Sequence, residues 1–333
     1  MRSKKSYIDL HLHLDGAISL PIAKRLAQLQ DIELPVKSDE QLIQLLSLPD
    51  GCESLNDFLK CFAFPGTLLQ TEVGIREAVR MVIEEAAANG AVYVEIRFAP
   101  QLHTNGIEGR PETRLTMEDS IKAAIEGLNR ASIKANLILC LMRGEGNEEA
   151  NLATIELAKK YLVEDGGVTA LDLAGAEGLY PTEKYEEMFR LAKSYGIPFT
   201  IHAGEAAGPE SVKAAIDFGV SRIGHGTRAL EVAKLLKEKG ITVEMCFTSN
   251  LLTKACASPE EFPIRKYLEM GISVTINTDD PAIECTTIDR EVALVREAFG
   301  LTIEEEKQLL LNAVDAAFMS ETAKEKLRKN IKK

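Results

Sequence analysis

Short apolar runs rich in β-branched residues recur along the chain, and each is followed by a stretch whose apolar positions repeat every three to four residues. Such runs predict buried strands, and such stretches predict amphipathic helices that pack on them. Eight strands are predicted, over residues 6–12, 91–97, 137–142, 168–173, 198–202, 221–225, 241–246 and 272–277. The helices predicted between them cover residues 74–89, 118–133, 149–163, 183–195, 209–218, 229–239 and 260–270.

Several predicted helices end at a glycine directly before the next strand, as in AKSYGIPFT and KEKGITVE, which is the usual end of a helix in a β/α unit. Eight strands that alternate with helices predict the α/β class and, within it, a TIM (β/α)₈ barrel. An open doubly wound sheet is the alternative, but its first turn normally carries G-x-G-x-x-G, whereas this first strand runs into LHLDGAI. No linker or low-complexity tract interrupts the pattern, so one barrel domain is predicted over residues 1–333.

Two segments fall outside the alternation. Between Gly16 and Gly90 the chain holds an insertion with further helical patterns over residues 19–30, 39–47 and 54–62. Insertions after a barrel strand lie at the C-terminal mouth, so this one either covers a site there or only packs against the barrel, and the sequence leaves both open. Residues 302–330 predict two additional C-terminal helices.

Polar residues of the first and last predicted strands alternate with apolar ones. Side chains along a strand point to its two faces in turn, so each polar set is predicted to share one face. The sets are Asp9, His11, His13 and Asp15 in the first strand, and Ser273, Thr275, Asn277 and Asp279 in the last. Because the outside of a barrel packs on helices and is apolar, both polar sets are predicted to face the barrel interior.

Four of the five histidines stand at predicted strand ends, where barrels of this kind place their catalytic groups. An interior with four imidazoles and several carboxylates would be very costly without a metal ion or substrate. Imidazole and carboxylate ligands with an open coordination position fit a catalytic zinc site better than a closed structural one. The residues at these ends are His11, His13, Asp15, Asp172, His202, His225, Asp279 and Asp280.

Other zinc signatures are absent from the sequence, which has neither an H-E-x-x-H segment nor the P-C-x-x-C segment of cytidine-type deaminases. The fifth histidine, His103, receives no role, because a lone histidine is more often a core or surface residue than a ligand.

The composition of the chain disfavours some classes of binding partner. The net charge of −12, from 39 basic and 51 acidic residues, disfavours binding to nucleic acid or to an anionic membrane. The N-terminus lacks the apolar run of a signal peptide, and no stretch reaches the roughly 18 apolar residues of a membrane helix. The six cysteines are scattered without a C-x-x-C pair, so reduced thiols and a cytoplasmic location are expected.

Seven short segments form an ordered set between about residues 7 and 300. They are HLHLDGA (11–17), IRFAPQLHT (96–104), DLAGAE (172–177), IHAGE (201–205), RIGHGTRA (222–229), TSNLLTK (248–254) and NTDDP (277–281). Together they resemble the adenosine deaminases of the amidohydrolase superfamily, and the set is specific although each segment alone is weak. The resemblance implies a hydrolase that converts adenosine, and also 2′-deoxyadenosine, to inosine and ammonia in purine salvage.

The resemblance also implies residue roles. Glu205 would donate a proton to N1 of the purine ring, and His225 would orient the attacking water and help it lose its proton. Asp279 would accept a hydrogen bond from the same water as well as bind the metal ion. One zinc ion per subunit would be held by His11, His13, His202 and Asp279. The end of the fourth strand, LDLAGAEG, has no lysine to bridge a second metal ion, which favours one.

For the substrate, the resemblance implies a purine nucleoside held by His13, Asp15, Gly175 and Asp280. Asp280 would meet N7, the Gly175 amide would meet N3, and Asp15 would bind the ribose 5′ hydroxyl. Two of the predicted site residues also have simpler interpretations. Asp15 fits an Asp-Gly turn, and Glu205 fits an acidic residue at a helix start.

Some positions depart from the family pattern. Ala176, Phe247 and Phe262 stand where family members often have Asp, Pro and His, and AIECTTID replaces a segment that in animal forms often begins with an aromatic residue. None is a predicted ligand, so these departures affect pocket shape and substrate preference. The alternatives are a deaminase of adenine, N6-methyl-AMP or a 5′-modified adenosine, another metal-dependent amidohydrolase, and a non-catalytic binding barrel. A monomer or weak homo-oligomer is expected.

Overall fold

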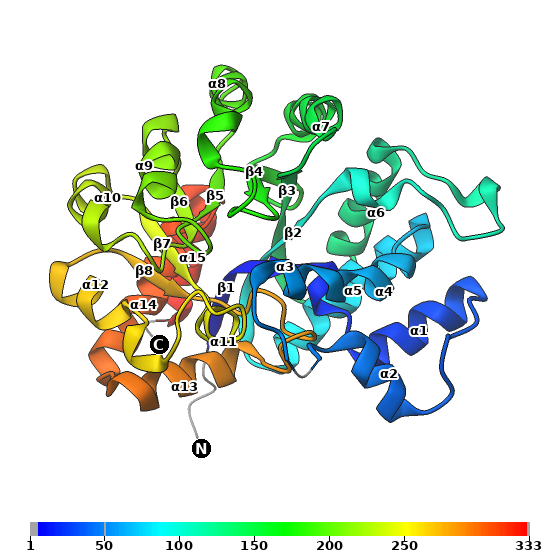
Figure 1. Cartoon of the computed structure of the whole chain (residues 1–333), viewed down its shortest axis with the longest axis horizontal. Helices are drawn as coiled ribbons and strands as arrows, with labels where there is room; N and C mark the ends of the chain where they lie inside the picture. The colour runs from blue at the N-terminus through cyan, green and yellow to red at the C-terminus, as the bar shows by residue number, and fades with distance from the viewer. Residues whose placement is uncertain (1–5, 50, 332–333) are drawn as a thin grey trace.

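Eight parallel strands form the centre of the molecule, and helices surround them (Figure 1). The computed structural model describes residues 6–49 and 51–331. The strands are β1 (Tyr7–His13), β2 (Ala91–Phe98), β3 (Lys134–Met142), β4 (Val168–Ala174), β5 (Thr200–Ala203), β6 (Arg222–His225), β7 (Thr242–Met245) and β8 (Val274–Ile276). They form two ladders, in the orders β1-β2-β3-β4 and β5-β6-β7-β8, and every pairing within them is parallel.

Isolated parallel bridges join the two ladders at both seams. Leu171 of β4 pairs with Phe199 just before β5, and Leu12 of β1 pairs with Asp279 just after β8. At the second seam the Asp279 N–H donates to the His11 carbonyl at 2.8 Å. The strands therefore follow one another in chain order around a ring, and the predicted α/β barrel is confirmed.

The helices follow the strands as the apolar periodicity predicted, with most bounds shifted by a few residues. Their bounds are α1 (Leu20–Gln30), α2 (Asp39–Leu46), α3 (Leu55–Phe58), α4 (Ala63–Thr67), α5 (Glu72–Ala88), α6 (Met117–Asn129), α7 (Glu148–Tyr161), α8 (Glu186–Ser194), α9 (Pro209–Phe218), α10 (Ala233–Lys239), α11 (Phe247–Leu252), α12 (Ile264–Met270), α13 (Ile288–Phe299), α14 (Ile303–Ala316) and α15 (Glu321–Ile331). Helix α9 has the predicted bounds. Helices α4 and α11 are too short to be detected from periodicity. Helix α13 is absent from the predicted helices although its apolar positions are periodic.

The main hydrophobic core lies between the outer faces of the strands and the helices. Val94 and Ile96 of β2 are completely buried in the same cluster as Val79 and Ile83 of α5. Complete burial of such side chains contributes roughly 1.5–3 kcal/mol each. This apolar layer uses one face of each strand and leaves the other face for the polar interior.

The N-terminal end of the barrel is closed by apolar side chains. Ile8 and Leu10 of β1 pack with Tyr93 of β2 against Val314 of α14 and Ala317 just beyond it. The two C-terminal helices predicted from the sequence are confirmed, and the first of them covers this end of the barrel.

Asp9 lies on a different face from His11, and the prediction that they share one face was wrong for this residue. Its carboxylate accepts bonds from the Thr278 N–H and hydroxyl and from the His11 N–H, and it lines an outer hollow together with Leu12. The ladder between β1 and β2 shifts register between Asp9 and Leu12. A bulge of this kind inserts one residue and so reverses the alternation of faces on one side of it.

The insertion between β1 and β2 reaches the mouth of the barrel. Leu55 and Phe58 of α3, with Leu59 and Phe62 of the following 3₁₀ turn, line the same pocket as the polar groups at the strand ends. Of the two interpretations left open by the sequence, this part of the insertion covers the pocket.

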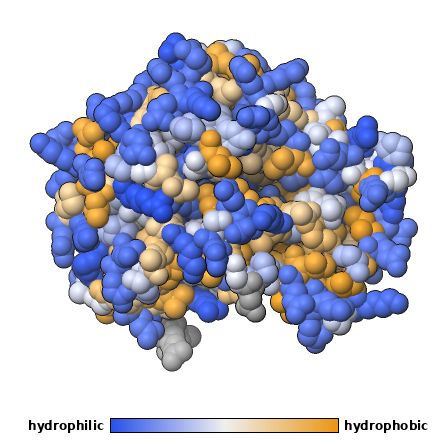
Figure 2. All heavy atoms as spheres, viewed as in Figure 1, coloured by the Kyte–Doolittle hydropathy of each residue, from blue (hydrophilic) through white to orange (hydrophobic). Residues whose placement is uncertain are grey.

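Hydrophilic side chains predominate around the edge of the face drawn in Figure 2, and apolar side chains gather toward its middle. Among the described residues, no helix combines the length and the apolar character that crossing a membrane requires.

Candidate active site

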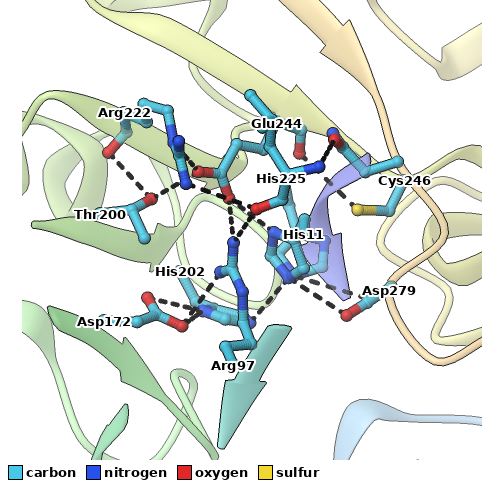
Figure 3. A network of polar contacts seen from close by, with 12 residues as sticks. His11, Arg97, Asp172, Thr200, His202, Arg222, His225, Glu244, Cys246 and Asp279 are labelled. Carbon is cyan, nitrogen blue, oxygen red and sulfur yellow. Dashed lines mark hydrogen bonds and ion pairs between the residues drawn. The ribbon is translucent and has the colours of Figure 1, made fainter. Parts of the chain in front are cut away.

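Four side chains from three places in the barrel converge on one point. His11 and His13 come from β1, His202 comes from β5, and Asp279 follows β8. Figure 3 shows His11, His202 and Asp279 close together. The Nε2 atom of His202 lies 3.1 Å from the Nε2 atoms of both His11 and His13. Asp279 Oδ1 lies 3.1 Å from His11 Nε2 and 3.4 Å from His13 Nε2. The structure therefore brings together all four predicted metal ligands.

These spacings fit a single metal ion. Four ligands at the zinc–nitrogen distance of about 2.0–2.1 Å lie about 3.3 Å apart at the corners of a tetrahedron, close to the observed separations. His13, His202 and Asp279 also line the pocket, so this side of the cluster is accessible to a small molecule. The donor set of three imidazoles and one carboxylate is the chemistry that a catalytic zinc ion prefers.

Hydrogen bonds on the far side of two imidazoles fix their rings. His11 Nδ1 lies 2.7 Å from Glu244 Oε2, and His202 Nδ1 lies 3.0 Å from Asp172 Oδ2. Carboxylates in these positions hold the tautomer that leaves Nε2 free to bind a metal ion. Asp172 was expected at its strand end. Glu244 was not, although a glutamate within the apolar run ITVEMC was a usable signal.

A belt of buried ion pairs lies beneath the ligands. Arg97 bridges Asp172 at 3.1 Å and Glu244 at 2.9 Å (Figure 3). Arg222 bridges Glu244 at 2.5 Å and Glu95 at 2.7 Å. All five side chains are inaccessible to solvent. In spite of burial, His202 and Arg97 hold the pKa of Asp172 well below its usual range, so the belt remains ionised.

Two residues of the site have backbone conformations that favour glycine. His225 has φ of 62° and Asp279 has φ of 65°. Such conformations cost of order 1–3 kcal/mol for a residue with a side chain and are concentrated at functional sites. Here they turn the imidazole and the carboxylate into the pocket at the ends of β6 and β8.

His225 and Glu205 lie side by side at the pocket. His225 Nε2 is 3.6 Å from Glu205 Oε2 and 3.9 Å from Asp279 Oδ2, while Nδ1 lies 3.0 Å from the Asn250 side-chain amide. Burial lowers the pKa of His225 well below its usual value, in spite of the neighbouring Asp279, so the imidazole is neutral. Burial, then the charges of Asp279 and Glu177, raise the pKa of Glu205 to about 8, so its carboxyl is protonated near neutral pH.

The pocket encloses about 270 Å³ and is lined by most of the predicted site residues. Asp15, Gly175 and Asp280 line it together with apolar side chains such as Phe98 and Met142. Asp15 lies in a short 3₁₀ turn after β1, and burial raises its pKa to about 6. A pocket of this size, in which polar and apolar side chains face each other, fits one small molecule with both polar and apolar parts. The predicted site residues in its lining are His13, Asp15, Gly175, His202, Glu205, His225, Asp279 and Asp280.

His103 lies outside this pocket, as its lack of an assigned role anticipated. Its ring is buried against Phe98, with the ring centroids 5.7 Å apart, and neither ring nitrogen has a hydrogen-bond partner.

Fold and site together define a metal-dependent barrel enzyme of the amidohydrolase type, with a candidate metal-binding cluster and further titratable side chains at the C-terminal strand ends. The chain belongs to the adenosine deaminase family, whose family model matches residues 7–333. It is 47% identical to an adenosine deaminase of Haemophilus ducreyi over 97% of this chain and 95% of that relative.

Solved structures agree with the fold. An adenine deaminase of Arthrobacter aurescens is similar with a TM-score of 0.86, at 25% identity and over 98% of both chains. An N6-mAMP deaminase of Arabidopsis has a TM-score of 0.83, at 26% identity, over 98% of this chain and 97% of that chain. The resemblance to the adenosine deaminase family seen in the sequence is thus confirmed. Related deaminases with different substrates share the same architecture.

Proposed function

We propose that the protein catalyses the hydrolytic deamination of adenosine and 2′-deoxyadenosine to inosine and ammonia. The observation that carries the proposal is the placement of Glu205 and His225 on one side of the His-His-His-Asp cluster, within one pocket. The near-full-length similarity to an adenosine deaminase at 47% identity supports the same activity.

The residues that would hold the metal ion are His11, His13, His202 and Asp279. We assign the metal ion as one zinc ion, because the ligand set and its spacings match zinc chemistry. A bound zinc ion supplies Lewis acidity that makes water ionise near neutral pH. Glu244 and Asp172 act through hydrogen bonds that hold two of the imidazoles in place.

Proton transfer falls to Glu205 and His225. Neutral His225 accepts a proton from the attacking water, and the protonated Glu205 carboxyl donates its proton to N1 of the ring. Protonation of N1 withdraws electrons from C6, where the oxygen of water forms its bond. The amino group then takes the proton held by His225 and leaves as ammonia, and the C6 hydroxyl returns a proton to Glu205 as the carbonyl of inosine forms. One water is consumed for each ammonia released, and both residues regain their starting protonation states.

The lining of the pocket supports the substrate contacts that the family resemblance implies. The Gly175 N–H donates to N3, and Asp280 donates from its protonated carboxyl to N7, an atom that can only accept. Burial and the Asp279 and Asp15 charges raise the pKa of Asp280, which supports this protonation state. Asp15 and His13 lie on the β1 side of the pocket, where Asp15 binds the ribose 5′ hydroxyl.

The experiment is a comparison of purine substrates with purified protein. The ultraviolet absorbance of the ring is followed with adenosine, adenine and AMP, before and after treatment with a chelator. Turnover of adenosine alone that is lost on chelation supports the proposal. Turnover of another purine but not of adenosine would change the assigned substrate and leave the assigned metal site unchanged. The absence of any metal-dependent turnover would refute deamination.

A second candidate is deamination of a related adenine compound, which the similarity to adenine and N6-mAMP deaminases makes specific. Asp15 disfavours a substrate with a 5′-monophosphate, because its buried carboxyl would lie beside the negative charges of the phosphate and repel them. The ratio of kcat/KM for adenosine and N6-methyl-AMP separates the two candidates.

A further inference from the structure

The carboxylate of Glu177 binds the backbone of the turn that carries Glu205. Its Oε1 accepts the Gly204 N–H at 2.7 Å, and its Oε2 accepts the Glu205 N–H at 3.0 Å. The same Oε2 accepts the N–H groups of Ala206 at 2.6 Å and Ala207 at 2.9 Å. Four successive amides therefore converge on one side chain that comes from the loop after β4.

The N–H groups of residues 204–207 are not paired with carbonyl groups of a helix or strand. Helix α9 begins only at Pro209, so residues 204–207 lie between the end of β5 and the first helical turn. Successive N–H groups that point to one side form a concave anion site, and leaving those of the buried residues Gly204 and Glu205 unpaired would be costly. Glu177 is itself buried, and its negative charge suits that site.

A chain of hydrogen bonds also ends at the Glu177 carboxylate. Arg143 Nη2 donates to Thr182 Oγ1 at 2.9 Å, because a guanidinium can only donate. The hydroxyls of Thr182 and Ser211 lie 2.7 Å apart, and Ser211 donates to Glu177 Oε1 at 2.5 Å. The Glu177 carboxylate therefore accepts five hydrogen bonds, four from backbone N–H groups and one from the Ser211 hydroxyl.

The position of Glu205 depends on this turn. Gly204 has φ of 74°, and a Cβ there would lie 2.7 Å from Val212 Cγ2, so the backbone turns tightly at this residue. The Glu205 side chain projects from the next residue into the pocket, whose lining also includes Gly175 from the loop that carries Glu177. Movement of the turn by about 1 Å would separate the Glu205 carboxyl from a ring nitrogen, and misplacement on that scale can cost about 10²-fold in rate.

We propose that Glu177 is a positioning residue, which fixes the Glu205 carboxyl for proton transfer by holding the four amides of residues 204–207. This inference rests on the proposed function of Glu205 as proton donor. Glu177 does not touch the substrate, and it contributes to the rate only through the turn.

The test compares Glu177→Gln with Glu205→Gln and with the double variant. Glutamine keeps the volume of Glu177 but replaces one accepting oxygen by a donating NH₂ group, which faces the backbone N–H groups. We expect Glu177→Gln alone to lower kcat by about 10–100-fold, with little change in KM and in bound metal. In the Glu205→Gln background the same substitution should change kcat by less than about threefold, because the carboxyl to be positioned is gone. An equal loss in both backgrounds would overturn the proposal.

Glu291→Gln is the matched control. Glu291 is also a buried carboxylate that ties down a loop, through the Thr248 N–H at 3.1 Å and the Thr286 hydroxyl at 2.6 Å, but it does not contact the turn at 204–207. Any loss of rate from general destabilisation should appear in this variant, and equally in both backgrounds. Coupling to Glu205→Gln as strong as that of Glu177 would count against a specific role for Glu177.

Two further measurements keep the test decisive. If Glu177→Gln fails to fold, Ser211→Ala removes one support of the carboxylate, and a few-fold loss in kcat is expected that disappears in the Glu205→Gln background; a persistent loss would refute the proposal. Hydrogen exchange reports on the turn without substrate, and amides 205–207 should exchange faster in the variant than in the unsubstituted protein. Unchanged protection overturns the positioning role, whereas lack of adenosine turnover by the unsubstituted protein refutes only the proposed function.

Discussion

His103 should make the protein selectively sensitive to acid. The residue is 1% exposed, and within residues 6–49 and 51–331 neither ring nitrogen has a partner in good hydrogen-bond geometry. Burial lowers its pKa to about 4 and outweighs an opposing effect of the Leu69 backbone. The unfolded chain binds a proton at His103 near pH 6.5, whereas the folded protein does not bind one until about pH 4. Stability from this residue is therefore complete above pH 6.5 and falls as the pH is lowered toward 4.

The difference of about 2.5 pKa units corresponds to about 3 kcal/mol between pH 7 and pH 4. His103→Phe removes the titrating group and keeps an aromatic ring beside Phe98. Urea unfolding of both proteins after chelation should show similar stabilities at pH 7 and a gap that widens to about 3 kcal/mol in favour of the variant at pH 4.

Taking the difference between the two proteins cancels the titration of every other group and any loss of bound metal. Stability curves that run parallel from pH 7 to pH 4 would refute the reasoning, because they would mean that folded His103 takes up its proton as readily as the unfolded chain does.

Three predictions concern the active site. Glu205→Gln should retain the metal ion yet lose about 10²–10⁴-fold in kcat, the usual effect of removing a general acid, and near-normal turnover would remove Glu205 from the mechanism. His202→Ala should lose bound metal and activity together, as measured by metal analysis and turnover, and a variant that stays loaded and active would contradict the ligand set. Glu244→Gln should weaken metal binding by about 10–100-fold in a chelator competition, because His11 loses the carboxylate that orients it, and unchanged affinity would show that its orientation has another cause.

The polar groups at the strand ends were predictable because each lies next to a short apolar run with a clear period. His202 and His225 stand where the strand pattern stops, and the barrel rule then places both at one end. The face of Asp9 was not predictable, since the register shift between β1 and β2 depends on the pairing of two strands and not on the local pattern.

Residues that act through other side chains were also beyond the sequence. Glu177 meets the turn after β5 only because the loops of neighbouring strands come together in the barrel. Asn250 contacts His225 across two elements in the same way. Nothing in the local sequence distinguishes Glu177 or Asn250 from other polar residues, and only the three-dimensional structure shows which groups they contact.

The buried belt has a consequence for charge balance inside the barrel. Two guanidinium groups, of Arg97 and Arg222, face four carboxylates, which belong to Glu95, Asp172, Glu244 and Asp279. With neutral imidazoles, these six side chains together carry two uncompensated negative charges, and all but Asp279 are completely inaccessible to solvent. A divalent cation at the histidines balances the charge of this set, whereas a monovalent ion leaves it anionic, so two arginines that do not touch the ion favour a divalent one.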